Sequence, residues 1–142
     1  MQDFASYGWA LAAVALYAVM AQVLNAATGI RKGKLKMVPG AHHTPDFANP
    51  SYRLDRTYMN SVEMMVFYTA LVITAIMAGA DPLWVNLLAV LGLVFRVMAN
   101  VIYLRGIGGQ YGGLRTGLIV GASAVNIGLA LLTFSAAVWY HH

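Results

Sequence analysis

Two groups of polar side chains occur at the same spacing within otherwise apolar parts of the chain. Each group follows the pattern i, i+4, i+7: Arg56, Asn60 and Glu63 in the first, and Arg96, Asn100 and Tyr103 in the second. At about 100° per residue, this spacing places the members of each group on one face of an α-helix. Arginine can hold a carboxylate through paired N–H groups, and a glutamate can hold an ammonium. The pattern therefore indicates a cleft for a small zwitterionic ligand.

Three further arginines, Arg31, Arg53 and Arg115, fall near the expected mouth of this cleft. A simpler alternative is structural, with Glu63 and Arg96 forming a buried ion pair and with Asn60 and Asn100 bridging helices. A charge at membrane depth costs about 3 kcal/mol or more on insertion scales, so such residues usually pair or serve function. The surplus arginines favour the ligand cleft, because a lone ion pair needs none of them.

The elements that must position these residues are four long apolar segments. The first, Phe4–Ile30, carries no charged residue, and the fourth, from Thr116 to Tyr140, carries none either. The second and third contain one charge each, Glu63 and Arg96. A helix needs ~20 apolar residues to cross a bilayer, whereas barrel strands alternate over ~10 residues. We therefore expect one all-α domain over residues 1–142, a polytopic membrane four-helix bundle with helices near 5–30, 52–80, 82–105 and 113–140.

Composition supports the bilayer as the main solvent of the chain. Hydrophobic residues make up 60% of the sequence and charged residues 10%, against about 25% charged residues in soluble domains. The chain has no cysteine, which excludes disulfides, a cysteine nucleophile and cysteine metal ligands, and no metal site is predicted. The net charge of +4 does not predict nucleic-acid binding, because the basic residues lie between apolar spans.

The basic residues also predict an orientation. Eight of the nine lysines and arginines flank the first and third connections, and the ninth is Arg96. The positive-inside rule places these two connections in the cytoplasm. Both termini are then periplasmic or lumenal, as in a bacterial inner-membrane protein, and an aromatic belt on that side accounts for Trp9, Trp84 and Trp139. Between helices two and three, Gly79, Asp81 and Pro82 predict a tight hairpin.

At these residues the sequence resembles the MAPEG family, the membrane-associated proteins in eicosanoid and glutathione metabolism. The segment Arg56-Thr57-Tyr58-Met59-Asn60-Ser61-Val62-Glu63 fits the family pattern R-x-x-x-N-x-x-E at the opening of helix two. Arg96 and Tyr103 follow seven apart on helix three, and a basic residue opens helix four. The pattern alone is moderately specific, but its place in a four-span chain of this size makes the combined signal strong.

The resemblance implies a homotrimer of four-helix bundles with glutathione bound between neighbouring subunits near the cytoplasmic face. It implies that glutathione contacts Arg56, Asn60, Glu63, Arg96 and Tyr103, with Arg31 at a matching basic position. Asn100 and Arg53 join this expected binding set through their position beside the cleft. The arginine that stabilises the thiolate in catalytic members looks like Arg115. Arg105 is a rival, because the third connection looks longer than the usual family spacing.

We therefore expect a glutathione-dependent membrane transferase or peroxidase, similar to a glutathione S-transferase, acting on apolar electrophiles or lipid peroxides. Such a substrate would enter laterally from the bilayer. Two other functions remain open. A non-catalytic lipid-binding or scaffold protein can share the same fold, and a small transporter subunit could use Glu63 and Arg96. The absence of a visible inverted repeat argues mildly against the transporter.

Overall fold

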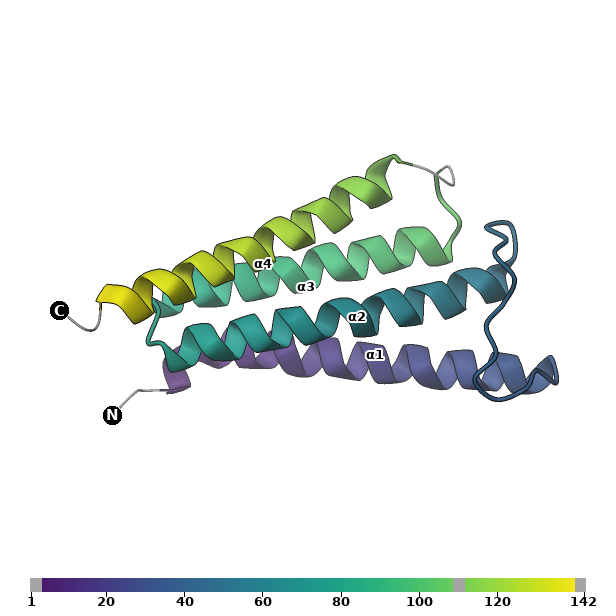
Figure 1. The fold of residues 1–142 in the computed structure, drawn as a ribbon, viewed down its shortest axis with the longest axis horizontal. Helices are drawn as coiled ribbons and strands as arrows, with labels where there is room; N and C mark the ends of the chain where they lie inside the picture. The colour runs from purple at the N-terminus through teal and green to yellow at the C-terminus, as the bar shows by residue number, and fades with distance from the viewer. Residues whose placement is uncertain (1–3, 109–111, 140–142) are drawn as a thin grey trace.

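The computed structural model describes residues 4–108 and 112–139. It contains a short 3-10 helix at Phe4–Tyr7 and the α-helices α1 (Gly8–Lys34), α2 (Pro50–Met77), α3 (Pro82–Leu104) and α4 (Leu114–Trp139) (Figure 1). All four α-helices are long and apolar enough to cross a membrane, which confirms the prediction of an all-α, multi-pass membrane protein. Residue 140, the expected end of the fourth helix, lies outside the described residues, as does the middle of the third connection.

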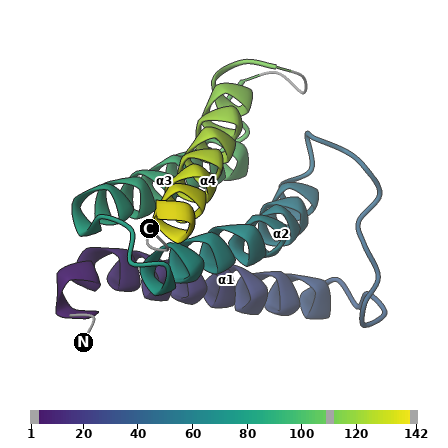
Figure 2. The same ribbon diagram turned by 60° about the vertical axis from the view of Figure 1, so that its left-hand side comes forward.

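The four helices run alternately up and down, so the molecule has two distinct ends (Figure 1). The α2–α3 turn, the beginning of α1 and the end of α4 lie together at one end, called here the hairpin end. The α1–α2 loop and the α3–α4 connection lie at the other, called the loop end. Figure 2 shows the α3–α4 pair crossing the α1–α2 pair. The polar residues of α2 and α3 therefore come together toward the loop end.

Local capping chemistry makes the α2–α3 turn tight, as predicted. Gly79 has a positive φ of 70°, a conformation that glycine adopts without the steric cost of a Cβ atom. The Asp81 side chain accepts a hydrogen bond from the Leu83 backbone nitrogen at 2.9 Å and caps α3, with Pro82 in its first turn. Because α2 ends and α3 begins within a few residues, their registers relative to each other are set by this turn.

Polar contacts also fasten the beginning of α1 to α3 at the hairpin end. The Asn86 side chain accepts a hydrogen bond from the Ala10 backbone nitrogen and donates to the Ser6 carbonyl, both at 2.8 Å. The Tyr7 hydroxyl donates to the Ala80 carbonyl at 2.5 Å. In a bilayer, unpaired backbone groups cost several kcal/mol each, so these bonds satisfy groups that the helices leave free.

The core between the helices combines small residues with a few large ones. Ala10, Ala75 and Ala89 are fully buried, which lets the helix backbones approach closely. Tyr17 and Leu129 fill the remaining space as the largest buried side chains. Large apolar side chains on the outer faces are exposed on the single chain: Trp9, Met77, Leu83, Phe134.

Ionic contacts hold the α1–α2 loop against the bundle. The helix α1 extends past Ile30, the expected end, to Lys34, and it carries Lys32 on this last turn. The Lys32 Nζ atom lies 2.7 Å from a carboxylate oxygen of Asp55, which is 2% exposed. The Nδ1 atom of His42 lies 3.3 Å from the other oxygen. Asp55 thus connects the end of α1, the loop and the first turns of α2.

Candidate functional site

Arg96 is the centre of the candidate site. It lies on α3, is 3% exposed, and donates from Nη2 to the Asn60 carbonyl on α2. The Asn60 side-chain oxygen in turn accepts from Arg56 at 3.2 Å. The two polar stripes therefore meet at Asn60 and Arg96. No carboxylate pairs with Arg96 within residues 4–108 and 112–139.

A second layer of hydrogen bonds fixes α3 against α2 and α1. The Asn100 amide donates to the Ser61 hydroxyl at 2.9 Å and also contacts the Met20 sulfur at 3.5 Å. The Tyr17 hydroxyl donates to the Ser61 carbonyl at 3.2 Å. Buried hydrogen bonds of this kind specify one helix–helix register, because a misplaced register would leave polar groups unpaired in an apolar environment. The Asn100 amide nitrogen therefore bridges helices.

Tyr103 and Arg115 form the outer part of the site at the loop end. The Arg115 guanidinium lies over the Tyr103 ring, 4.6 Å from its centroid, in a cation–π arrangement. The Phe47 ring packs against the Tyr103 ring as well, with the two ring centroids 5.5 Å apart. The Nε atom of Arg115 is buried and has no hydrogen-bond partner among the described residues. Arg115 thus presents an unused donor beside a ring that holds it in place.

These side chains surround a small cavity between α2, α3 and α4. Its volume is about 10 Å³, close to that of a single water probe. The residues that line it are Thr57, Asn60, Arg96, Ala99, Asn100, Tyr103, Arg115 and Ile119. Within one protomer, this cavity is too small to enclose a tripeptide.

A larger cavity of about 300 Å³ lies beside it, under the α1–α2 loop. This volume is at the lower end of ordinary ligand pockets. Its lining residues are His42, His43, Pro45, Tyr52, Asp55, Arg56 and Met59. Arg56 lines this cavity and bonds to Asn60, which lines the smaller one. The two cavities are therefore linked through one hydrogen-bonded pair of side chains.

Glu63 does not reach Arg96. Its side chain is exposed on the outer surface of α2, and Arg56 is exposed as well. The described residues contain no ion pair between Glu63 and Arg96. The structural alternative of a buried Glu63–Arg96 pair is therefore wrong, because the Asn60 carbonyl takes the place expected for the carboxylate. Helical periodicity placed both groups on single faces, but it did not determine how far each face turns inward.

Two of the three surplus arginines have structural contacts. Arg53 donates to the carbonyls of Phe47, Ala48 and Leu104 at 2.7, 3.0 and 3.3 Å. It thereby fastens the loop and the end of α3 through its Nη1 and Nε atoms. Arg31 is exposed and donates from Nε to the Ser51 hydroxyl at 2.7 Å, so its terminal nitrogens remain available.

The rival arginine for the thiol role lies farther from the site. Arg105 is exposed immediately after α3, and it does not line the small cavity, whereas Arg115 does. The geometry therefore favours Arg115 over Arg105 as the side chain nearest to a ligand bound beside Tyr103.

No group of three or more His, Asp or Glu side chains in the described part of the chain is placed to hold a metal ion.

Sequence reasoning did not single out several residues that build this site. Ser61 accepts from both Asn100 and Tyr17, but a serine inside an apolar span gives no strong signal. Asp55 anchors the loop. In the sequence, the one sign of this role is that Asp55 is an acidic residue directly before Arg56, at the expected membrane boundary. Asn126 on α4 is a further polar residue at membrane depth that could have been noticed by the same reasoning applied to Arg96.

Comparison with protein-family models places the chain in a known family. The family model described as the MAPEG family matches residues 6–135, which includes α1, α2, α3, most of α4 and every residue of the candidate site. No curated protein sequence matches the chain.

Proposed function

The chain belongs to the MAPEG family, and on that premise we propose that it is a membrane enzyme that binds glutathione and activates its thiol. The observation that carries this proposal is the buried Arg96 guanidinium, which has no carboxylate partner among the described residues and borders a cavity. A buried cation without a counter-charge is costly. A ligand carboxylate bound beside Arg96 would supply that counter-charge.

Glutathione suits the charges around the two cavities. It carries two carboxylates and one ammonium, and Arg56, Arg96 and Arg115 offer three guanidinium groups within the linked cavities. Charge-assisted hydrogen bonds to carboxylates are about twice as strong as neutral ones. The exposed Glu63 would hold the ammonium from the outer side of α2. The peptide would then extend from the larger cavity past the Arg56–Asn60 pair toward Tyr103.

Arg115 is the side chain we assign to thiol activation. A free thiol has a pKa of about 8.5, so only a few per cent is thiolate at neutral pH, and the thiolate is the nucleophile. A guanidinium within ~4–6 Å lowers this pKa, and each unit corresponds to ~1.4 kcal/mol. A shift of about two units would make the thiolate dominant at pH 7. The buried Nε of Arg115, which has no hydrogen-bond partner in the part of the chain that the structure describes, supports this role.

The thiolate would react with an apolar molecule that arrives from the bilayer. In conjugation, a sulfur–carbon bond forms and the bond between that carbon and the leaving group breaks. With a lipid peroxide, sulfur attacks one oxygen, the O–O bond breaks, and the released alkoxide takes a proton. A second glutathione then converts the sulfenic product to the disulfide and water. The apolar outer faces of the helices would bring such substrates to the site by lateral diffusion.

We further propose that the working form is a homotrimer with its loop end in the cytoplasm. Glu63 on α2 and the amides of Gln22 and Asn25 on α1 are exposed on the single protomer, and polar groups facing lipid at membrane depth are costly. A neighbouring copy would cover them. It would also enclose the ligand, which the small cavity of one protomer cannot do. The basic residues near the loop end support a bacterial inner-membrane orientation with periplasmic termini.

The small size of the inner cavity also favours a second candidate function. A non-catalytic lipid-binding or scaffold protein would keep the same bundle and the same loop contacts without enclosing a peptide. Titration of the purified protein with glutathione in lipid nanodiscs, followed by conjugation to an aromatic electrophile, separates the two. Binding with turnover supports the enzyme, binding without turnover supports the non-catalytic protein, and no binding contradicts the glutathione site.

A further inference from the structure

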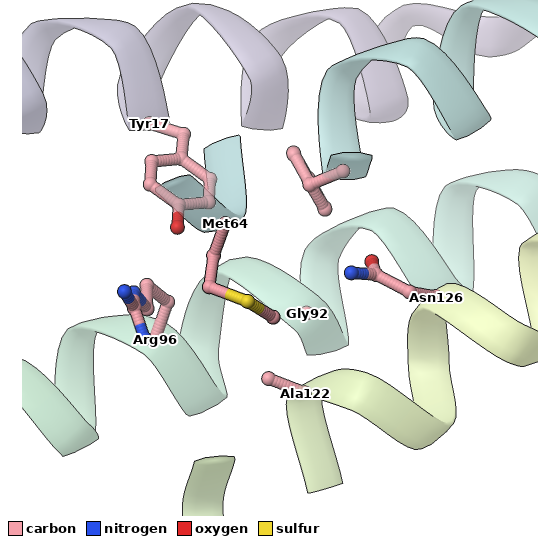
Figure 3. Close-up of a pocket in the computed structure, with 7 residues that line it drawn as sticks. Tyr17, Met64, Gly92, Arg96, Ala122 and Asn126 are labelled. Atoms are coloured by element: carbon pink, nitrogen blue, oxygen red, sulfur yellow. The ribbon is translucent and has the colours of Figure 1, made fainter. Parts of the chain in front are cut away.

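A polar chamber in the middle of the bundle shares Arg96 with the candidate site (Figure 3). This central chamber receives residues from all four α-helices: Tyr17, Met64, Tyr68, Gly92, Arg96, Ala122 and Asn126. Its volume is about 10 Å³, which leaves no room for a ligand larger than a water molecule. In Figure 3, Met64 lies between Arg96 and the Asn126 amide. The polar groups of this chamber therefore matter for how they hold Arg96, and the nearest of them is Tyr17.

The Tyr17 hydroxyl connects a backbone carbonyl of α2 with the Arg96 guanidinium. It donates its proton to the Ser61 carbonyl at 3.2 Å. Its oxygen points toward Arg96 (Figure 3) and accepts a hydrogen bond from the guanidinium. Arg96 also donates to the carbonyl of Asn60, the residue before Ser61. One hydroxyl from α1 and one guanidinium from α3 are thus linked to each other and to two consecutive carbonyls of α2.

Burial makes this chain of hydrogen bonds effective in fixing Arg96. Tyr17 is 1% exposed and Arg96 is 3% exposed. In such surroundings hydrogen bonds in a chain polarise one another, so a hydroxyl that donates its proton becomes a better acceptor. The guanidinium is held by the Asn60 carbonyl from α2 and by the Tyr17 oxygen from α1. These two contacts together determine its orientation more narrowly than either one alone.

Tyr68 is a second buried tyrosine of the same chamber, and its hydroxyl bonds elsewhere. It is 3% exposed, and its ring centroid lies 5.2 Å from that of Tyr17. Its hydroxyl donates to the Ala89 carbonyl at 2.7 Å. Each tyrosine therefore gives its proton to a helix carbonyl, but of the two it is Tyr17 whose oxygen also contacts Arg96. Tyr68 is thus a matched control for the loss of a buried hydroxyl.

We propose that Tyr17 is a positioning residue for glutathione binding, whose hydroxyl holds the Arg96 guanidinium in the orientation that meets a glutathione carboxylate. This inference rests on the proposed function, because it takes Arg96 as a ligand-binding group. Arg96 lines both the central chamber and the small cavity, so a contact on the chamber side sets how the guanidinium faces the cavity. Tyr17 is not among the residues that line the small cavity. Helix α1 thus contributes to binding through a residue that does not touch the ligand.

Glutathione affinity tests the proposal through Tyr17→Phe and Tyr68→Phe. Phenylalanine keeps the buried ring, so each substitution removes one hydroxyl and its bond to a backbone carbonyl. By calorimetry in lipid nanodiscs, we expect Tyr17→Phe to raise Kd about 3- to 10-fold, the effect of one hydrogen bond, and Tyr68→Phe to change Kd by less than about twofold. The Tyr17→Phe effect should disappear in an Arg96→Gln background, because the hydroxyl acts through the guanidinium.

A merely structural role for Tyr17 predicts a different pattern. Both tyrosine variants would then lower Tm, since each loses one buried hydrogen bond, and neither would change Kd more than the other. Three results would overturn the proposal. They are an unchanged Kd in Tyr17→Phe, an equal rise of Kd in Tyr68→Phe, and an undiminished effect of Tyr17→Phe in the Arg96→Gln background.

Stability without ligand separates failure of this inference from failure of the proposed function. The combined Tm change of Tyr17→Phe and Arg96→Gln should depart from the sum of the single changes by about 2 °C or more, as expected for groups in contact. Tyr68→Phe combined with Arg96→Gln should depart by less. Additive changes for Tyr17 and Arg96 would overturn the contact itself. If the unsubstituted protein binds no glutathione, the proposed function fails and Tyr17 has no ligand to serve, while coupled Tm changes would still show that it holds Arg96.

Discussion

Replacing Arg96 by glutamine is the most direct perturbation of the proposed site. The substitution removes a guanidinium that is 3% exposed and that has no carboxylate partner within the described residues. It also removes the hydrogen bond to the Asn60 carbonyl. We expect glutathione binding to weaken strongly while the free protein loses little stability, because the loss of one bond is offset by the loss of an unpaired buried charge.

The magnitude follows from the burial of the charge. Two unit charges ~4 Å apart interact by about 4 kcal/mol at an effective dielectric of 20. Part of this is offset by the desolvation of the ligand carboxylate, and a hydrogen bond to a charged group contributes about 1.5–3 kcal/mol net. At 1.4 kcal/mol per factor of ten, Kd for glutathione should rise about 10- to 150-fold.

Isothermal titration calorimetry in lipid nanodiscs, with Tm measured on the same samples, is the suitable assay. The control is Lys34→Gln, which removes an exposed positive charge at the end of α1 and should change Kd by less than about twofold, since exposed charges are screened. An unchanged Kd in Arg96→Gln together with a large fall in Tm would refute the reasoning. Arg96 would then serve only to bind the Asn60 carbonyl.

Three further substitutions test other parts of the structure. Arg115→Ala should keep glutathione binding but remove the thiolate absorbance band, because the pKa of the bound thiol would return toward about 8.5. Asp55→Asn should speed proteolysis of the α1–α2 loop and lower stability by about 1–3 kcal/mol, because it leaves Lys32 without its buried partner. Gly92→Ala should lower Tm, with an overpacking cost of about 1–3 kcal/mol, since its Cβ would lie 3.1 Å from the Tyr68 ring.

Each of these substitutions has a matched control in the chain. Arg105→Ala removes the rival arginine and should leave the thiolate band intact; loss of the band there instead would move the thiol role to Arg105. Asp46→Asn alters an exposed carboxylate whose side chain accepts from the Ala48 backbone nitrogen, so a similar effect on the loop would argue against the Lys32 ion pair. Gly117→Ala meets open space, and a comparable loss there would contradict the packing argument.

The sequence alone was sufficient for the spans and their local chemistry. Charge-free stretches of bilayer length predict helices wherever they pack, because the backbone must satisfy its own hydrogen bonds in lipid. The turn at Gly79, Asp81 and Pro82 was predictable for the same reason: capping depends only on neighbouring residues. Helical periodicity also correctly grouped Asn60 with Arg56 and Asn100 with Arg96. These are properties that each segment has by itself.

Only the tertiary structure decided which polar side chains face one another. It turned Glu63 outward, gave Arg96 a carbonyl instead of a carboxylate, and used Arg53 to fasten the loop. It also brought Asn126 into the same chamber as Arg96. The physical reason is that lipid tails are as apolar as the core, so hydrophobicity does not mark the inner face of a membrane helix. The rotation of each helix depends on packing and hydrogen bonds between segments distant in the sequence.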